Sequence, residues 1–428
     1  MTAMLKRARD YAASFDRRLW ALCAAWVLNG LGYSMVLPFL SLYLTRERDV
    51  SMSQVGTVLL VAGLFRTFGQ SVGGTVVHRL GCMRAIVGSQ AVQLLSYLAL
   101  AACVERRVPL AALGALISLS YLANAVFQCG ADVLTARLTP ERQRVEAYGI
   151  TRVGLNVGWA TGPAIGAFLA RTPYSLLFLL AAGVAAANVG ILAALVREPA
   201  AAPEEGAPVA SGGGAGRPGW AGIFRERSLL ALCAVWFVLA LLMSQLVSIL
   251  PVYATESAGL SQPQLGWLYT FNGLLCIAFQ IPVAAAVKRH RLTGVLAAGA
   301  AVYSLGYLSF AWRAGFPGAL ASICVVTLAE IAVNPAATAL ASLLSRPREL
   351  ARNMAAFGLA RALGYAAGPM IGGALFDVWK DRPPALWGTL SLFGLAAAVG
   401  FLLLGRFGRT GPSPQRPQSS QSQSPTED

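Results

Sequence analysis

The chain contains twelve apolar runs, each about as long as the part of a helix that crosses a membrane. The hydrocarbon core of a bilayer is roughly 30 Å thick, and about 20 helical residues cross it. Inside that core the backbone has no water to bond, so a run of this length must form a helix. The runs therefore predict an all-α membrane protein with twelve transmembrane helices.

The predicted helices form two sets of six, separated by a longer polar segment. The first set lies within residues 19–196 and comprises Leu19 to Leu44, Ser53 to Val77, Arg84 to Val104, Pro109 to Leu134, Val145 to Ala170 and Tyr174 to Val196. The second set lies within residues 229–405 and comprises Leu229 to Thr255, Pro263 to Val287, Leu292 to Trp312, Pro317 to Leu343, Asn353 to Phe376 and Pro384 to Leu404. Each set predicts one six-helix bundle.

Composition supports lipid as the surrounding solvent. Hydrophobic residues make up 56% of the chain and charged residues only 12%, against about 25% charged in an average soluble chain. Such a chain lacks the polar surface that would cover a core of this size in water. The net charge of +15 does not indicate nucleic acid as a partner, because the basic residues are scattered through short loops.

The positions of Lys and Arg predict the orientation of the helices. With the N-terminus inside, the cytoplasmic segments hold 23 of the 34 Lys and Arg residues and the opposite loops hold 8. Cytoplasmic loops carry such an excess, so both termini are expected in the cytoplasm of a multi-pass cell-membrane protein. A cleaved signal peptide is the competing interpretation of the first run, but that run is too long and has no small-residue cleavage site.

Three segments fall outside the predicted helices. Residues 1–18 are expected to form a cytoplasmic N-terminus. Residues 197–228 are rich in Ala, Pro and Gly and predict a flexible cytoplasmic linker between the two bundles. Residues 406–428 are rich in Ser, Gln and Pro and predict a disordered cytoplasmic tail.

The second set of helices repeats the first at an offset of 210 residues. Residues 19–26, LWALCAAW, return as LLALCAVW at 229–236, and six further matches keep the same register through the fourth helix. Matches that arose by chance would not hold one offset over such a length. The repeat predicts two pseudo-symmetric six-helix bundles, an arrangement of transporters whose substrate site lies between the halves near the middle of the membrane.

Two motifs connect these helices to a known family. The loop between the second and third spans contains Gly74, His78, Arg79, Gly81 and Arg84, and the fifth span contains Gly149, Gly158, Gly162, Pro163 and Gly166. A weaker copy of the second motif lies in the eleventh span, at Gly364, Gly368, Pro369, Gly372 and Gly373. In these residues the chain resembles the major facilitator superfamily, and within it the twelve-helix drug:proton antiporter branch. The resemblance implies the major facilitator fold and an antiporter.

The first motif departs from the family pattern. The family usually has Asp at the position of His78 and a basic residue at the position of Cys82. The resemblance implies that this Asp holds the halves together on the cytoplasmic side, and a neutral His cannot supply its charge. Arg79 or Arg84 could instead pair with Asp132, which we expect to act in gating. The near-symmetric Arg152 and Arg361 are expected at contacts between the halves, with substrate recognition as the alternative.

Glu330 is the only acidic residue well inside a predicted span. Charged groups at that depth face the interior of the bundle and are functional candidates. We expect Glu330 to bind a proton in one state and to release it in the other, because desolvation favours its neutral form when substrate is absent. The alternative is a permanently protonated Glu330 that only hydrogen-bonds a neighbouring helix.

Polar residues on other spans predict the lining of a substrate cavity. The candidates are Asn29, Tyr33, Arg66, Gln70, Asn124, Gln128, Gln245, Tyr269, Asn272 and Asn334. Arg66 could bind an anionic group, pair with Glu330 or tune a proton site. Aromatic residues such as Trp26, Trp236 and Trp267 would complete a lining that suits an amphiphilic or hydrophobic solute, although Trp also marks membrane interfaces.

The sequence offers nothing for an enzyme. It has two histidines in separate loops, and its seven cysteines lack metal-ligand spacing. We therefore expect no metal and no cofactor, and a monomer that moves a small molecule with protons as the coupling ion. A lipid or glycolipid flippase, a receptor, and a proton-independent metabolite facilitator of the same fold are the alternatives.

Overall fold

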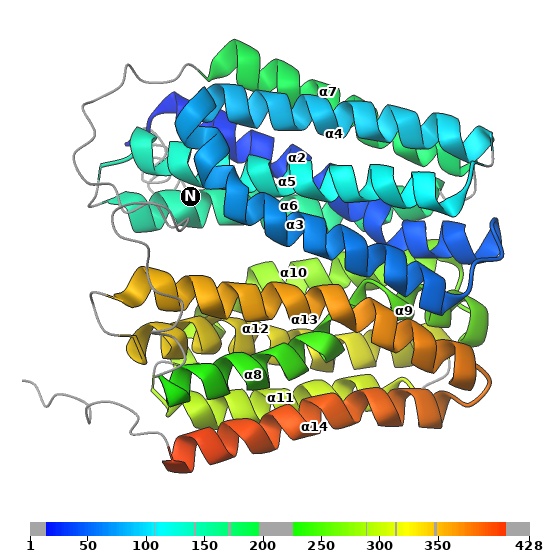
Figure 1. The fold of residues 1–428 in the computed structure, drawn as a ribbon. Helices are drawn as coiled ribbons and strands as arrows, with labels where there is room; N and C mark the ends of the chain where they lie inside the picture. Colours follow the sequence, from blue (N-terminus) through cyan, green and yellow to red (C-terminus); the bar gives the residue numbers. More distant parts are fainter. Residues whose placement is uncertain are drawn as a thin grey trace, which may run out of the picture.

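The computed structural model describes residues 14–106, 108–140, 143–169, 173–196, 226–287, 289–312, 315–345 and 349–407. Regular structure in these ranges is entirely helical. Nearly all of the predicted linker and tail, and most of the predicted N-terminal segment, lie outside the described residues. The labels α2 to α14 follow Figure 1.

Six helices form the first half of the molecule, coloured blue to green in Figure 1. They are α2 (Arg17–Arg46), α3 (Met52–Leu80), α4 (Cys82–Glu105), α5 (Leu110–Leu138), α6 (Arg144–Leu169) and α7 (Tyr174–Leu195). Two short connections are specified locally. Gly81 has φ 84° and joins α3 to α4, and the side chains of Ser51 and Gln54 form a capping box at the start of α3.

The second half also crosses the bundle six times, but its first pass is not one helix. That pass consists of α8 (Arg227–Met243), the 3₁₀ turn η3 (Ser244–Leu246), α9 (Ile249–Val252) and the π turn η4 (Tyr253–Ser257). It is followed by α10 (Gln262–Val287), α11 (Leu292–Ser309), α12 (Gly315–Leu343), α13 (Leu350–Trp379) and α14 (Pro383–Phe407). The continuous helix predicted from Leu229 to Thr255 is therefore wrong around residues 244–248. Pro251 cannot donate to the carbonyl of Val247, but α2, α6, α10, α12 and α13 each contain an internal proline without such a break.

The two halves have the same internal packing. In the first half α2 packs on α6 and α7, α4 packs on α5 and α7, and α3 packs on α5. In the second half α8 packs on α13 and α14, α11 packs on α12 and α14, and α10 packs on α12. Each pair in one half corresponds to a pair in the other. The duplicated bundle predicted from the 210-residue offset is therefore confirmed.

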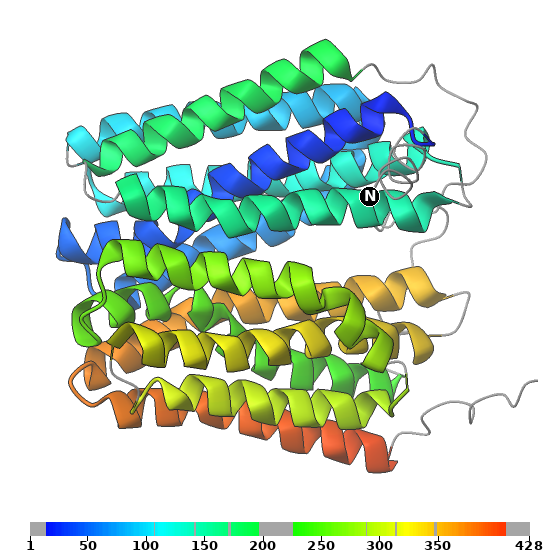
Figure 2. The same ribbon diagram turned by 180° about the vertical axis from the view of Figure 1, so that it is seen from behind.

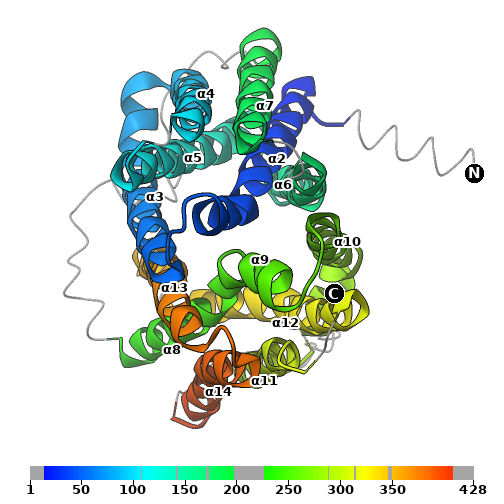
Figure 3. The ribbon, with the colours of Figure 1, turned by 90° about the vertical axis from the view of Figure 1, so that its right-hand side faces the viewer.

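The halves meet mainly along two helix pairs, α3 with α13 and α6 with α10, and α2 also contacts α9. Figure 3, viewed along the helices, shows these pairs on opposite sides of the junction. We call the end that carries the connections at 81, 139–143 and 344–349 the linker side, and the end that carries those at 47–51, 258–261 and 380–382 the far side. In Figures 1 and 2 the linker side holds the beginning of α2 and the end of α14.

Nine of the described helical segments are long and apolar enough to cross a membrane. α6 and α13, which contain Arg152 and Arg361, are not among them. Both lie at the junction between the halves, where α6 contacts α10 and α13 contacts α3. Their polar and small residues therefore belong to an interface inside the protein, which relieves them of the need to be uniformly apolar.

On the far side the halves are in close contact. Gly56 of α3 lies against the backbone of Pro369, Gly373 of α13 lies against the backbone of Met52, and Gly266 of α10 lies against Pro163 and Ala167 of α6. Any side chain at these glycines would overlap the opposite helix. The Asp377 carboxylate also accepts hydrogen bonds from the backbone N–H groups of Met52 and Ser53, at 2.9 and 2.8 Å.

Candidate functional site

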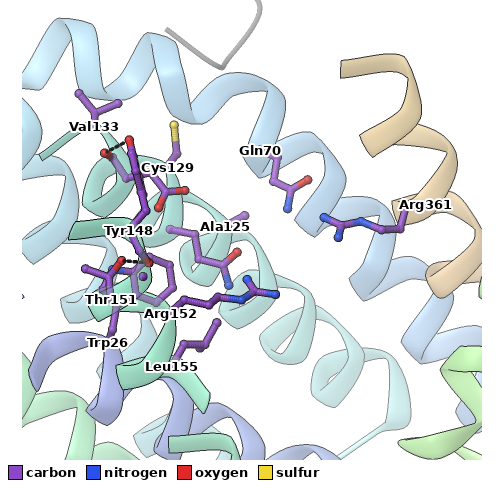
Figure 4. A pocket seen from close by; sticks show the side chains of 13 residues that line it. Trp26, Gln70, Ala125, Cys129, Val133, Tyr148, Thr151, Arg152, Leu155 and Arg361 are labelled. Atoms are coloured by element: carbon purple, nitrogen blue, oxygen red, sulfur yellow. Dashed lines mark hydrogen bonds between the residues drawn. The ribbon is translucent and has the colours of Figure 1, made fainter. Parts of the chain in front are cut away.

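A cavity of about 710 Å³ lies on the linker side of the junction. Its lining comes mainly from α5 and α6, with α2, α3 and α13 supplying single residues: Trp26, Gln70, Ala125, Gln128, Cys129, Asp132, Val133, Tyr148, Gly149, Thr151, Arg152, Leu155 and Arg361. Asp132 and Tyr148 lie near the linker-side ends of their helices. Figure 4 shows Arg361 facing Gln70 and the α5–α6 wall from the opposite half.

Charged groups in this cavity are not paired with one another. Asp132, Arg152 and Arg361 are all exposed on the cavity wall. Among the described residues no carboxylate lies within 4.0 Å of either guanidinium. Arg152 is the charge that acts on Asp132. The expected pairing of Asp132 with Arg79 or Arg84 does not occur in this structure.

Arg66, on α3, contacts a residue of the cavity lining. Its Nη2 donates to Oε1 of Gln128 at 3.4 Å, and its guanidinium carbon lies 5.7 Å from the centre of the Tyr33 ring. Tyr33 in turn packs against Tyr121 and Trp159, with ring centroids at 5.3 and 5.9 Å. A cation over an aromatic face is stabilised by the ring quadrupole. Arg66 therefore joins the polar wall of the cavity to an aromatic cluster deeper in the first half.

Several predicted lining residues instead form a buried amide network within the first half. Asn124 donates to Asn29 at 3.1 Å, Asn29 donates to Gln93 at 3.5 Å, and Gln128 donates to Asn124 at 2.9 Å. Asn29 and Asn124 are 3% and 1% exposed. Of this group only Gln128 reaches the cavity, so Asn29 and Asn124 hold helices together and do not line the described space.

Glu330 lies inside the second half and does not face the exterior. It is partly buried on α12, and its Oε2 atom is buried without a hydrogen-bond partner. Tyr303 on α11, Tyr365 on α13 and Asn272 on α10 lie close enough to interact with it, as does Arg152 of the first half. The alternative pairing of Glu330 with Arg66 is absent. Asn334 donates to the Glu330 backbone carbonyl at 3.2 Å.

The remaining candidates of the second half are satisfied by neighbouring helices. Gln245 is buried and donates to the carbonyls of Leu241 and Gly368, at 2.7 and 2.9 Å. Tyr269 donates to the carbonyl of Leu246, and Asn272 donates to Thr327 at 2.7 Å. Trp236 is buried against Phe357, whereas Trp267 is 62% exposed. None of these lines the described cavity.

The glycine motif of α6 serves packing within its own half. Gly158, Gly162 and Gly166 lie against the backbone of α2, and Gly368 lies against Leu241 and Ser244 of the first pass of the second half. The close contacts of these glycines therefore lie within each half. The prolines of the motif do reach across, because the Pro163 carbonyl lies against Gly266 and the Pro369 carbonyl against Gly56.

The loop motif lies at the linker-side end of α3. His78, Arg79 and Arg84 are exposed there, and Gly74 lies one turn before them on α3. Gly81 allows the tight turn into α4, because its positive φ is a conformation that favours glycine. This motif is outside the cavity lining.

Part of the cavity wall was not predicted from the sequence. Cys129, Val133, Tyr148, Thr151 and Leu155 line the cavity. A helical pattern could have indicated the residues on α6, because Tyr148, Thr151 and Leu155 follow the spacing of one helix face and Arg152 is among them. No comparable signal marks Asp377, which lies at a predicted helix end.

Comparison with known sequences agrees with this geometry. A sequence model of the Major Facilitator Superfamily matches residues 22–263 and 246–427. The multidrug resistance protein MdtH of Shigella sonnei is 24% identical over 392 residues, covering 88% of this chain and 90% of that protein. The uncharacterized MFS-type transporter YqjV of Bacillus subtilis is 23% identical over 376 residues, covering 87% of this chain and 90% of that protein.

Solved structures share the fold. The nucleoside transporter NupG superposes with a TM-score of 0.76 at 13% identity, covering 91% of this chain and all of that one. A bacterial homologue of the human lysosomal transporter Spinster, solved in an inward-facing and occupied conformation, gives a TM-score of 0.72 at 14% identity, covering 95% of this chain and 99% of that one. The predicted twelve-helix, two-bundle fold is confirmed.

Proposed function

Because the chain belongs to the major facilitator superfamily, we propose that it exports a small amphiphilic or hydrophobic compound from the cytoplasm in exchange for protons. The likeness to multidrug resistance proteins supports the export of such compounds. The scarcity of acidic residues inside the helices limits the proton step to very few groups.

One observation carries this proposal: the cavity lies at the junction on the linker side, while the far side is closed by helix contacts. The Lys and Arg distribution assigns the linker side to the cytoplasm of a cell-membrane protein with both termini inside. Substrate then enters from the cytoplasm. Rocking of the two halves about the junction opens the far side and closes the linker side.

Glu330 is the proposed proton carrier. Burial of its Oε2 atom without a hydrogen-bond partner favours the neutral carboxylic acid, and a cation such as Arg152 favours the carboxylate when it comes close. A change in the distance between α6 and α12 alters the second effect without altering the first. The carboxyl can therefore bind a proton in one state and release it in the other.

The test is proton-driven transport by purified protein. An efflux and susceptibility screen in a host lacking its own pumps, repeated with a protonophore, identifies a transported compound. Proteoliposomes then measure its uptake with and without a pH gradient. We expect Glu330→Gln to lose at least about tenfold of gradient-driven transport, as loss of an acid–base group does. Glu105→Gln, at an exposed glutamate that ends α4, is the matched control.

Two results would contradict the proposal. If the pH gradient accelerates transport equally in Glu330→Gln and the unmodified protein, Glu330 is not the proton carrier. If the protonophore leaves efflux in cells unchanged, the chain is a proton-independent facilitator. If expression of the protein changes the accumulation of none of the tested compounds, transport of a lipid or a metabolite is favoured.

A further inference from the structure

Positive charge exceeds negative charge around the cavity. Arg152 and Arg361 line it, and Arg66 contacts the lining residue Gln128. The acids in the same region are Asp132, which lines the cavity, and Glu330, which is partly buried, does not line it, and is acted on by the charge of Arg152. With both acids ionised the region keeps one positive charge, and with Glu330 protonated it keeps two.

Arg361 is the arginine with the least compensation. It is exposed on the cavity wall, and among the described residues no carboxylate lies within 4.0 Å of it. Arg66 and Arg152 lie close enough to repel it. A guanidinium presents a planar fork of donors that matches a carboxylate or a phosphate. A cavity that holds such a group without a partner is suited to a ligand with an anionic group.

The Arg361 guanidinium has a second effect, because it lies across the junction from Arg152. Arg152 belongs to α6 of the first half and Arg361 to α13 of the second, and Figure 4 shows both side chains reaching into the cavity from these helices. Their mutual repulsion opposes closure of the linker side when the cavity is empty. An anion bound between them removes that repulsion, so the linker side can close around the occupied site.

The proposed exchange against protons adds a requirement, and this step rests on the proposed function. A bound anion beside Arg152 reduces the stabilisation that Arg152 gives to ionised Glu330, and so favours protonation of Glu330. A purely anionic substrate would therefore bind together with the proton and not in exchange for it. Binding effects between two ligands are reciprocal. Exchange therefore needs a positive group on the same substrate that competes with the proton for the acids of the cavity.

We propose that the substrate is an amphiphilic zwitterion whose anionic group binds between Arg152 and Arg361. Its cationic group lies toward Asp132 and Glu330, and its apolar body packs on Trp26, Val133 and Leu155, which line the same space. Arg361 is thus a specificity-determining residue that selects for the anionic group.

Equilibrium binding to the purified full-length protein tests this. Three probes share one dansyl body: Nε-dansyl-lysine is zwitterionic, its methyl ester is cationic, and its Nα-acetyl derivative is anionic. Energy transfer from tryptophan to the dansyl group, measured in the unmodified protein and in Trp26→Phe, reports occupancy of the cavity. We expect the zwitterion to bind most tightly. Arg361→Gln should weaken the zwitterion and the anion about tenfold or more, as expected for the loss of a charged hydrogen-bond partner, and should leave the ester unchanged.

Arg361→Lys, which keeps the charge, should retain most of the affinity, and Arg406→Gln, which removes an arginine near the end of α14, should leave all three affinities unchanged. Arg152→Gln provides an independent variant if Arg361→Gln does not fold.

Equal affinity for zwitterion and ester, equal weakening of all three probes by Arg361→Gln, or no saturable binding of any probe would overturn the proposal. Affinity for the anion equal to that for the zwitterion would overturn the cationic part. The binding measurement applies no proton gradient. If the probes bind with the expected order of affinities but proton-driven efflux is not observed, only the proposed function is refuted.

Discussion

Two carboxylates share one cation where the second half begins. Arg352 Nη2 lies 3.7 Å from Glu226 and 3.3 Å from Glu349, and Asn353 donates to Glu226 at 2.8 Å. Glu226 precedes α8, whereas the other three residues lie at the start of α13. The hydrogen bond with the Glu349 side chain, together with burial and the charge of Glu349, raises the pKa of Glu226 above its ordinary value.

This raised pKa predicts a pH dependence of stability. The folded protein binds the Glu226 proton more tightly than the unfolded chain does, so this stabilisation is present below the ordinary glutamate pKa and is lost as pH rises through the raised one. Glu226→Gln cannot titrate. The melting temperature in detergent, measured against pH, should therefore fall less for Glu226→Gln than for the unmodified protein over that interval. Glu146→Gln, at an exposed glutamate, is the control and should follow the unmodified protein. An equal fall of the melting temperature in Glu226→Gln and in the unmodified protein would contradict the prediction.

Single residues also show where sequence information ends. Glu330 could be singled out from sequence because an acid inside an apolar run is rare. Asn29 and Asn124 could be recognised as inward-facing, but whether an amide faces a cavity or another amide depends on helices that are distant in the chain. Arg361 was expected at a contact between halves. Its lack of a carboxylate partner depends on the arrangement of several helices, which no local pattern reports.

At the scale of helices, close approach explains the glycines of α6. A methyl group at Gly158 would overlap the Val27 carbonyl and the Leu31 amide of α2, and neither is the end of a flexible side chain. Small residues of this kind let helix backbones come together in membranes. The motif was identifiable from sequence because its spacing is regular. Its partner helix was not, because the same spacing would suit any neighbour.

Gly158→Ala therefore has a definite expected sign. Overpacking of a close contact costs roughly 1–3 kcal/mol, whereas alanine stabilises an unobstructed helix position by up to about 1 kcal/mol relative to glycine. Gly183 on α7 supplies the matched control, because a methyl group added there would have no neighbouring atom within 4 Å. Thermal unfolding should show Gly158→Ala less stable and Gly183→Ala unchanged or more stable than the parent. Equal effects at both positions would show that α2 and α6 separate easily.

At the scale of the whole molecule, the two ends of the junction have different designs. On the far side, glycines meet backbone and Asp377 accepts two amide hydrogen bonds at the start of α3. On the linker side, Arg152 and Arg361 face one another across the cavity. Attraction at one end and repulsion at the other favour the same state, in which the far side is closed. The repeat predicted two matching halves but not this difference between the two ends of the junction, because an offset in sequence does not indicate at which end the halves are in contact.

Asp377→Ala tests how far that state depends on one carboxylate. An N-cap acceptor contributes about 0.5–2 kcal/mol, and the positive end of the helix dipole adds roughly 0.3–1 kcal/mol for a negative charge. Since 1.4 kcal/mol changes an equilibrium tenfold, removal of this carboxylate should populate the state open on the far side by about tenfold more. Hydrogen exchange should speed up at the amides of Met52 and Ser53, and cavity ligands added from the linker side should bind more weakly because fewer molecules are open there. Asp381→Ala, an exposed neighbour with no such contact in the described structure, should change neither measurement; faster exchange without weaker binding would restrict Asp377 to capping α3.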